Sequence, residues 1–163
     1  MFSTYSFILT LLISGVGASF SMDLKKIIAL STLSQFGVII ITISLGLVEL
    51  SYFHLIRHAL FKSLLFLCAG VYIHSYGDIQ DIRDIAWVGT IKPLTRLFFI
   101  GCSLSLCGFP LLSGFYSKDL ILELFIELGV NSYLWSLVVI GTIRTFFYST
   151  RLIYYIILYL LYI

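Results

Sequence analysis

The sequence predicts an all-α polytopic membrane protein with five transmembrane segments, the fourth of them broken near its middle. Of the 163 residues, 60% are hydrophobic and only 11% are charged, whereas soluble domains contain about 45–50% apolar and about 25% charged residues. The apolar residues form long continuous runs, which indicates helices rather than the short alternating strands of a membrane β-barrel.

Five apolar runs are long enough to span a bilayer, whose core requires about 20 residues per helix. The first lacks a basic residue before Lys25, so it is interpreted as a mature span rather than a cleaved signal peptide. A polar loop at about 76–93 separates the third run from the fourth. The runs lie within a single membrane segment, 1–163, and cover about 3–21, 24–47, 51–75, 94–128 and 132–161.

The fourth run is too long for one straight span, because at ~1.5 Å per residue it would cover ~52 Å against a bilayer core of ~30 Å. We expect a break near Pro110–Phe115, since proline removes a backbone donor and Gly108 and Gly114 weaken the helix around it. Two half-helices at about 94–108 and 117–128 would result. Broken helices at membrane depth often build ion sites; a simple proline kink is the alternative.

Charges near the loops predict the orientation. The loops after the second and fourth spans and their flanks hold Glu49 and Glu127 but no lysine or arginine. By the positive-inside rule, the loops after the first and third spans face the matrix or cytoplasm, and the acidic Asp78 does not alter this. The basic residues there are Lys25, Lys26, Arg83, Lys92 and Arg96. The net charge of +2 includes no basic run that would suggest nucleic-acid binding.

The third span contains YFHLIRHALFKSLLF at 52–66, with four basic side chains in an apolar segment. Because His54, His58 and Lys62 are spaced four residues apart, they share one stripe of the helix and rise in steps of ~6 Å. A charge at the bilayer centre costs about 2.5–3.5 kcal/mol on insertion scales, so this stripe requires an explanation. Arg57 lies about 100° away and is expected to snorkel or to pair elsewhere.

Several interpretations of the stripe are open. The histidine pair could bind a metal, but no third ligand is evident, and haem-ligating histidines usually face each other from different helices. A proton relay requires groups that exchange protons near neutral pH, which histidine and a desolvated lysine can do. Pairing with neighbouring helices is the structural alternative. The thiols of Cys68, Cys102 and Cys107 lack metal-ligand spacing and are interpreted as structural.

Further polar residues lie at other membrane positions. Lys118 and Asp119 follow the break, where the dipole of the second half-helix favours the acid and disfavours the lysine; a local neutral pair is the alternative. Arg144, near mid-depth of the fifth span, requires a partner such as Asp119 or Glu123. Lys25 opens the second span, where lysines usually anchor a helix. Polar side chains that could admit water to that span are Ser31, Thr32, Ser34 and Gln35.

Five stretches carry recognisable motifs: DLKKIIALSTLSQFG (23–37), FHLIRHALFKSLLFLCAG (53–70), QDIR (80–83), PLLSGFYSKDLILE (110–123) and YSTRLI (148–153). Together they resemble the NADH-ubiquinone oxidoreductase chain 5 family, the distal antiporter-like subunits of respiratory complex I. The resemblance extends over about 17–155. Chain 4, chain 2 and the multi-subunit sodium/proton antiporters look less similar at IALSTLSQ and HALFK.

The resemblance implies a proton-translocating segment of NADH:ubiquinone reductase in an antiporter-like helix bundle of the mitochondrial inner membrane, with the loops after the first and third spans on the matrix side. Its relay would be coupled to quinone reduction elsewhere in the complex. Carried over by motif, the relay residues would be His54, His58, Lys62, Lys118, Asp119 and, with a less certain function, Lys25.

The resemblance also implies partners. Flavin, iron–sulfur clusters and ubiquinone would be held by other subunits, so no cofactor or metal is expected in this chain. The sequence matches roughly the ninth to thirteenth helices of the family. Either the gene is split, which the initial methionine favours, or the chain is partial. Expected partners are membrane-arm subunits including chain 4, chains supplying the missing helices, and lipids, but no nucleic acid.

Two basic residues depart from the family pattern. Arg57 and Arg144 stand where the family more often has small or uncharged residues, which suggests contacts with chains that replace a covalent connection. A component of a multi-subunit monovalent cation/proton antiporter and a purely structural membrane-arm segment remain the alternative functions.

Overall fold

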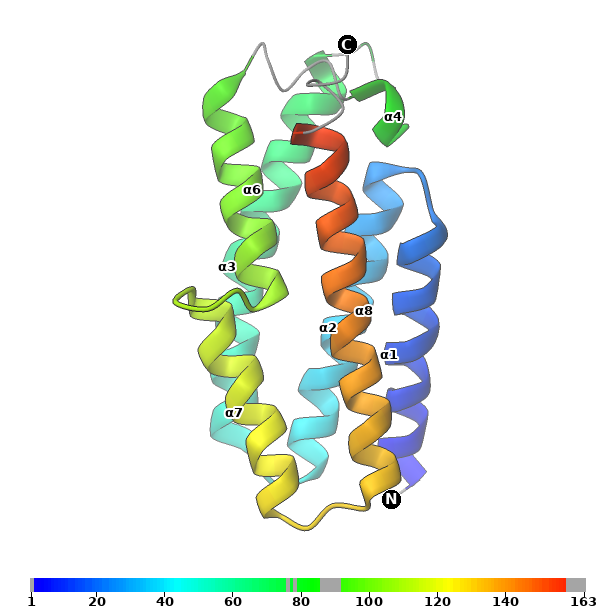
Figure 1. The fold of residues 1–163 in the computed structure, drawn as a ribbon, viewed down its shortest axis with the longest axis vertical. Coiled ribbons are helices and arrows are strands. Elements are labelled where there is room, and N and C mark those ends of the chain that lie inside the picture. Colours follow the sequence, from blue (N-terminus) through cyan, green and yellow to red (C-terminus); the bar gives the residue numbers. More distant parts are fainter. Residues whose placement is uncertain (1, 76, 78, 86–91, 158–163) are drawn as a thin grey trace.

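A computed structural model describes residues 2–75, 77, 79–85 and 92–157, and its regular structure there is helical, which confirms the all-α class. The helices form an elongated bundle, with α6 and α7 following each other along its long axis (Figure 1). Positions 158–161 of the expected fifth span, and Asp78 and 86–91 of the expected loop, lie outside the described residues. The helices are α1 (Phe2–Phe20), α2 (Leu24–Ser44), α3 (Val48–Ser75), α4 (Ile82–Ile85), α6 (Pro93–Cys107), α7 (Ser113–Glu127) and α8 (Ser132–Ile157).

Two of these helices, α2 and α3, are long and apolar enough to cross a membrane by length and composition, and α1 and α6 contain shorter apolar stretches. With 28 residues, α3 measures ~42 Å at ~1.5 Å per residue, which exceeds a bilayer core of ~30 Å. The count of five spans stays a prediction.

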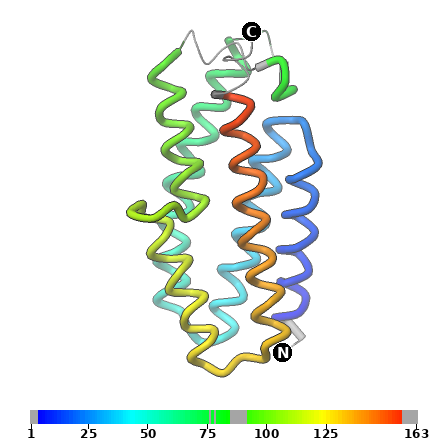
Figure 2. The backbone as a smooth tube through the Cα atoms, in the orientation of Figure 1, coloured from blue at the N-terminus to red at the C-terminus, as the bar shows by residue number. Residues whose placement is uncertain are grey.

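The break lies at mid-height of the bundle (Figures 1 and 2), but the second half-helix begins at Ser113, earlier than the expected residue 117. The expected extension of the break to Phe115 was therefore wrong. The cause is the amide of Phe115, which already donates to the carbonyl of Leu112 at 3.1 Å and so starts the first turn. Gly108 ends α6 with a φ of 84°, a left-handed conformation that glycine adopts without steric cost.

The turn after α1 and the segment before α4 meet at one end of the bundle (Figure 2). Asp23 and Asp81 form an isolated antiparallel bridge, in which the amide of Ile82 donates to the carbonyl of Met22 at 3.1 Å. The backbone amide and guanidinium of Arg83 donate to the Asp81 carboxylate and hold the pKa of that carboxyl below its usual range. The loops after the first and third expected spans thus share one end; which membrane side it faces stays a prediction.

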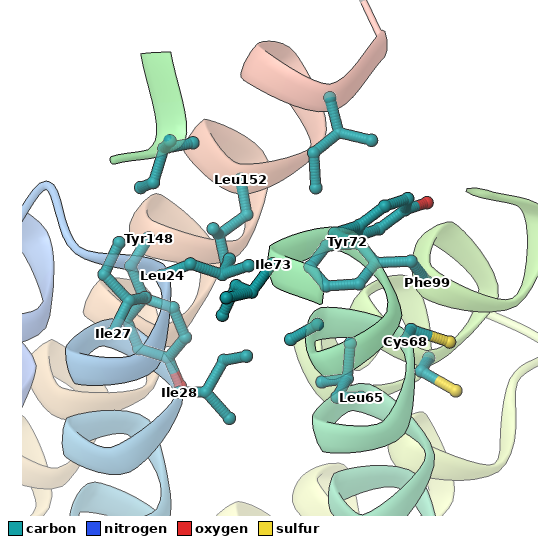
Figure 3. Close-up of a cluster of buried hydrophobic side chains, with 14 of the residues drawn as sticks. Leu24, Ile27, Ile28, Leu65, Cys68, Tyr72, Ile73, Phe99, Tyr148 and Leu152 are labelled. Atoms are coloured by element: carbon teal, nitrogen blue, oxygen red, sulfur yellow. The ribbon is translucent and has the colours of Figure 1, made fainter. Parts of the chain in front are cut away.

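Two apolar clusters hold the bundle together, one toward each end. The cluster nearer α4 joins α2, α3, α6 and α8, and contains Tyr72 packed edge-on against Phe99 with ring centroids 5.9 Å apart (Figure 3). Along α2 and α8, buried polar residues lie between this cluster and the second one. The second cluster consists of Ile8, Leu11, Val38, Ile41, Ile121, Phe125, Leu134 and Val138.

The packing of the two half-helices requires glycine at 114. A Cβ atom there would lie 1.6 Å from the carbonyl oxygen of Ser105. We expect Gly114→Ala to lower the free energy of unfolding by about 3 kcal/mol or more, at the upper end of overpacking costs. Thermal unfolding of the detergent-extracted protein measures the change.

Gly101→Ala is the matched control, because a Cβ at this position in α6 would meet no heavy atom within 4 Å. It should raise stability by about 0.5–1 kcal/mol, since alanine is the better helix former. Equal shifts in both variants would contradict the close contact between α6 and α7.

Candidate functional site

The basic stripe of α3 faces the interior of the bundle. The side chains of His54, His58 and Lys62 are only 5%, 6% and 5% exposed, so they share one buried stripe as their spacing predicts. The two imidazole rings are nearly parallel, with centroids 6.3 Å apart and 24° between their planes. All three basic groups therefore lie at the level of the buried polar residues that separate the two apolar clusters, which we call the polar layer.

Lys62 forms one end of this stripe and is held by α2. Its Nζ donates to the carbonyl of Ile28 at 3.3 Å and to the hydroxyl of Ser31. The Ser31 hydroxyl in turn donates to the same carbonyl at 2.8 Å. Oxygen acceptors of one helical turn thus solvate the ammonium group in place of water.

His54 connects three helices. Its Nε2 lies 3.3 Å from Oε1 of Gln35 on α2, and its Nδ1 lies 3.1 Å from the hydroxyl of Ser117 on α7. With the Gln35 oxygen as acceptor, neutral His54 carries its proton on Nε2 and accepts from Ser117. When Nδ1 is protonated as well, the Ser117 hydroxyl can turn to the carbonyl of Gly114, 3.3 Å away. His54 therefore keeps both hydrogen bonds in either protonation state.

Lys118 projects from α7 back to the end of α6. Long helical side chains point toward the N-terminus of their own helix, and here Nζ donates to the carbonyl of Leu106 and to the hydroxyl of Thr145, the latter at 3.1 Å. Leu106 lies in the last turn of α6, whose carbonyls lack partners within the helix and carry the negative end of its dipole. The disfavoured position expected for this lysine is thus offset by the neighbouring half-helix.

A cavity of about 10 Å³ lies between the histidine pair and Lys118. This volume matches about one water molecule, which requires two to four polar partners. Nε2 of His58 and Nη1 of Arg57 are buried there without a hydrogen-bond partner within the described part of the chain. The cavity therefore has the size and the polar lining that one water molecule requires. Other polar side chains lining the cavity are Gln35, His54 and Ser117.

The other proposed relay residues do not join this cluster. The Asp119 side chain is exposed, and within the described ranges it forms no ion pair with Lys118. Lys25 is exposed at the start of α2. The expected pairing of Arg144 with Asp119 or Glu123 was wrong, because Arg144 lies against Gly15 of α1 instead of facing α7.

Sequence reasoning missed the roles of Ser117 and Thr145, although a hydroxyl side chain in an apolar helix was an available signal. The guanidinium carbon of Arg57 lies 4.7 Å from the centroid of the Phe53 ring, a cation–π contact; its expected snorkelling or pairing elsewhere stays a prediction. No group of three or more His, Cys, Asp or Glu side chains that could hold a metal occurs in the described ranges. The Cys68 and Cys102 thiols lie in the apolar cluster near α4.

Comparison with known proteins identifies a matching family and several similar proteins. Residues 1–147 match the family described as NADH:quinone oxidoreductase/Mrp antiporter, TM. The chain is similar to NADH-ubiquinone oxidoreductase chain 5 of Locusta migratoria, with 52% identity over 147 residues, 90% of this chain and 26% of the relative. The corresponding protein of Anopheles gambiae is 50% identical, covering 90% and 25%, and that of Lumbricus terrestris 46% identical, covering 87% and 25%. The chain thus spans about a quarter of the length of the curated relatives it matches.

The hydrogen bond between His54 and Ser117 should contribute measurably to stability. Ser117→Ala leaves a buried ring nitrogen without its partner on α7, which costs about 1–3 kcal/mol. Ser63→Ala on α3 is the control, since the Ser63 hydroxyl is exposed and bonds only to the Leu60 carbonyl of its own helix. Thermal unfolding in detergent should show a lower midpoint for Ser117→Ala alone, and equal midpoints would contradict this network.

Proposed function

This chain belongs to the NADH:quinone oxidoreductase/Mrp antiporter transmembrane family, and we propose that it is a proton-translocating membrane-arm segment of NADH:ubiquinone oxidoreductase, respiratory complex I. The observation that carries the proposal is the polar row from buried Lys62 through the buried histidine pair to half-buried Lys118, which lies between two apolar clusters. Relatives named as chain 5 of this oxidoreductase, 46–52% identical, support the assignment.

In this proposal the chain is a multi-pass protein of the mitochondrial inner membrane. The spans are α1, α2, α3, the broken pair α6 and α7, and α8, and the end that holds α4 faces the matrix. The mid-height position of the linker between α6 and α7 supports a single broken span (Figure 1). The basic residues near the α4 end support the orientation.

Protons would move along the row by transfer between nitrogen atoms. A proton leaving Nζ of Lys118 passes through a water in the small cavity to Nε2 of His58, and His58 exchanges with Lys62 one turn further along α3. His54 can take part because both of its protonation states are hydrogen-bonded. Since like charges repel strongly in a medium of low dielectric constant, a proton on either lysine disfavours a proton on the other. A proton that binds to the lysine at one end of the row therefore favours release of the proton from the lysine at the other end.

The redox chemistry that drives this movement would take place elsewhere in the complex. Flavin, iron–sulfur clusters and ubiquinone would be bound by other subunits, and this chain would contribute proton-transfer groups only. Other membrane-arm subunits, including chain 4 and chains carrying the remaining helices of the family, would be its partners. Asp119 and Lys25 keep a proposed role at the entrance or exit of the row, in keeping with their exposure in the isolated chain.

Lys118→Arg separates proton transfer from structure. Arginine keeps a cation at the end of α6 but does not release its proton in proteins. We expect the affected proton-transfer step to slow by on the order of 10²-fold, so that proton translocation and the coupled quinone reduction both fall while the amount of assembled complex is kept. A pH-sensitive dye in proteoliposomes, together with NADH-driven quinone reduction, measures both activities.

Lys26→Met is the matched control for this experiment. Lys26 is exposed and forms an ion pair with Asp23 at 2.6 Å, outside the polar row. It should keep full activity. Full translocation and quinone reduction in Lys118→Arg would sink the assignment of Lys118 to the relay.

Lys62→Met distinguishes a relay from a purely structural segment. A relay predicts fewer protons translocated per electron at an unchanged level of assembled complex, because methionine fills a similar volume but carries no proton. A structural role predicts less assembled complex with normal pumping per electron. Blue-native gels and the proton-to-electron ratio measure the two quantities.

The family description also includes antiporters, so co-purification tests the broader assignment. We expect this chain to migrate in a native-gel band that oxidises NADH. Migration outside any such band, combined with sodium transport driven by a pH gradient in liposomes, would favour a cation/proton antiporter instead.

A further inference from the structure

A surface groove between α1 and α8 contains an arginine near the middle of the bundle. Its volume is about 370 Å³, and Arg144 lines it together with Ser19, Phe20, Ile140, Ile143 and Phe147. We propose that this groove is the docking site for a transmembrane helix of another polypeptide, which places a carboxylate against Arg144. The proposal does not rest on the proton relay.

The charge of Arg144 has no counter-ion on the helices that form the groove. Neither α1 nor α8 contains an acidic residue, and across the described ranges no carboxylate lies within ion-pair distance of Arg144. Arg151, two turns further along α8, differs: its guanidinium donates to the carbonyls of Ser19 and Ser21 at the end of α1. Arg151 therefore has two carbonyl acceptors within the chain, whereas Arg144 requires an external acceptor.

The depth of Arg144 in the membrane determines which kind of hydrogen-bond acceptor can reach its guanidinium group. Arg144 is 12 residues from the start of α8 at Ser132 and 13 from its end at Ile157, or ~18 Å and ~20 Å along the axis. Lipid headgroups lie at the borders of a bilayer core ~30 Å thick, so a phosphate at the border is separated from Arg144 by about half the core. An acceptor at the same depth must therefore be carried by a protein helix, and a carboxylate offers two oxygens to the guanidinium fork.

The shape of the groove also suits a helix. Gly15 of α1 lies against the Cβ of Arg144, so α1 and α8 approach each other closely at this level. Its walls are apolar, and the side chains of Phe20 and Phe147 are 77% and 67% exposed. Polar groups exposed to lipid at this depth are costly. A partner helix that is apolar except for one acidic residue would therefore complement the apolar walls and the single arginine of the groove.

Photo-crosslinking in native membranes tests the proposal. A benzophenone amino acid replaces Phe147, and the control replaces Leu67 of α3, which is equally exposed at 67%. Mass spectrometry should identify, at Phe147 only, an apolar segment of another polypeptide that contains Asp or Glu. Crosslinks to lipid alone, to a second copy of this chain, to a segment without an acid, or to the same segment from both positions would overturn the proposal.

Arg144→Gln then tests the charge. We expect recovery of the crosslinked polypeptide to fall by roughly tenfold or more, because a buried carboxylate loses its counter-ion, whereas Arg144→Lys should retain it. If Arg144→Gln lowers the amount of folded chain, Arg144→Glu combined with arginine at the partner's acidic position must restore recovery. Unchanged recovery in Arg144→Gln, or failure of this exchanged pair, would overturn the proposal. Normal pumping in Lys118→Arg would contradict the relay and leave this interface standing.

Discussion

The interaction on which the rest of the structure depends is the one between Lys118 and the end of α6. A helix that stops inside a membrane exposes carbonyl groups that no water satisfies. The ammonium group of Lys118 donates a hydrogen bond to one of these carbonyls, that of Leu106. Gly114 allows the two half-helices to pack closely enough for the lysine side chain to reach it. The same contact places a group capable of losing a proton beside the cavity that leads to the histidines. The Lys118 side chain therefore both satisfies the end of α6 and supplies a proton-transfer group to the proposed relay.

Several members of the buried polar layer satisfy one another, whereas Nε2 of His58 and Nη1 of Arg57 adjoin the small cavity without a partner in the described ranges. Ser31 and a backbone carbonyl solvate Lys62, and Gln35 and Ser117 hold His54 from two other helices. Hydroxyl groups are well suited to such a layer, since a hydroxyl both donates and accepts and can turn when its neighbour changes protonation state. A row built from amide or carboxylate groups alone would lose hydrogen bonds with each proton transferred. The apolar clusters on both sides fix the helices that carry these groups.

Patterns local to one helix were predictable from the sequence, and pairings between helices were not. The stripe of His54, His58 and Lys62 follows from spacing alone, and the break follows from proline and glycine. The start of α7 was placed too late, although the hydrogen bond that begins the helix, from the amide of Phe115 to the carbonyl of Leu112, is local. The partners expected for Arg144 were wrong, because the face of α8 that meets α1 or α7 depends on the rotation of this helix about its axis. That rotation is determined by the packing of the whole bundle. Asp119 forms no ion pair with the adjacent Lys118, as the angle of about 100° between neighbouring helical residues predicts.

Four basic residues within the bundle divide into two groups by whether their side chains have acceptors within this chain. Lys62, Lys118 and Arg151 donate to backbone carbonyls or hydroxyls of this chain, so their positions are fixed before any other polypeptide binds. Such preorganised donors need no partner subunit to complete the polar row. Arg144, by contrast, lines a groove and has no carboxylate of the described ranges within ion-pair distance. The proposed docking would therefore change the charge balance at the α1 and α8 face while leaving the contacts of the row intact, so the proposed relay and the proposed interface are separable properties of one bundle.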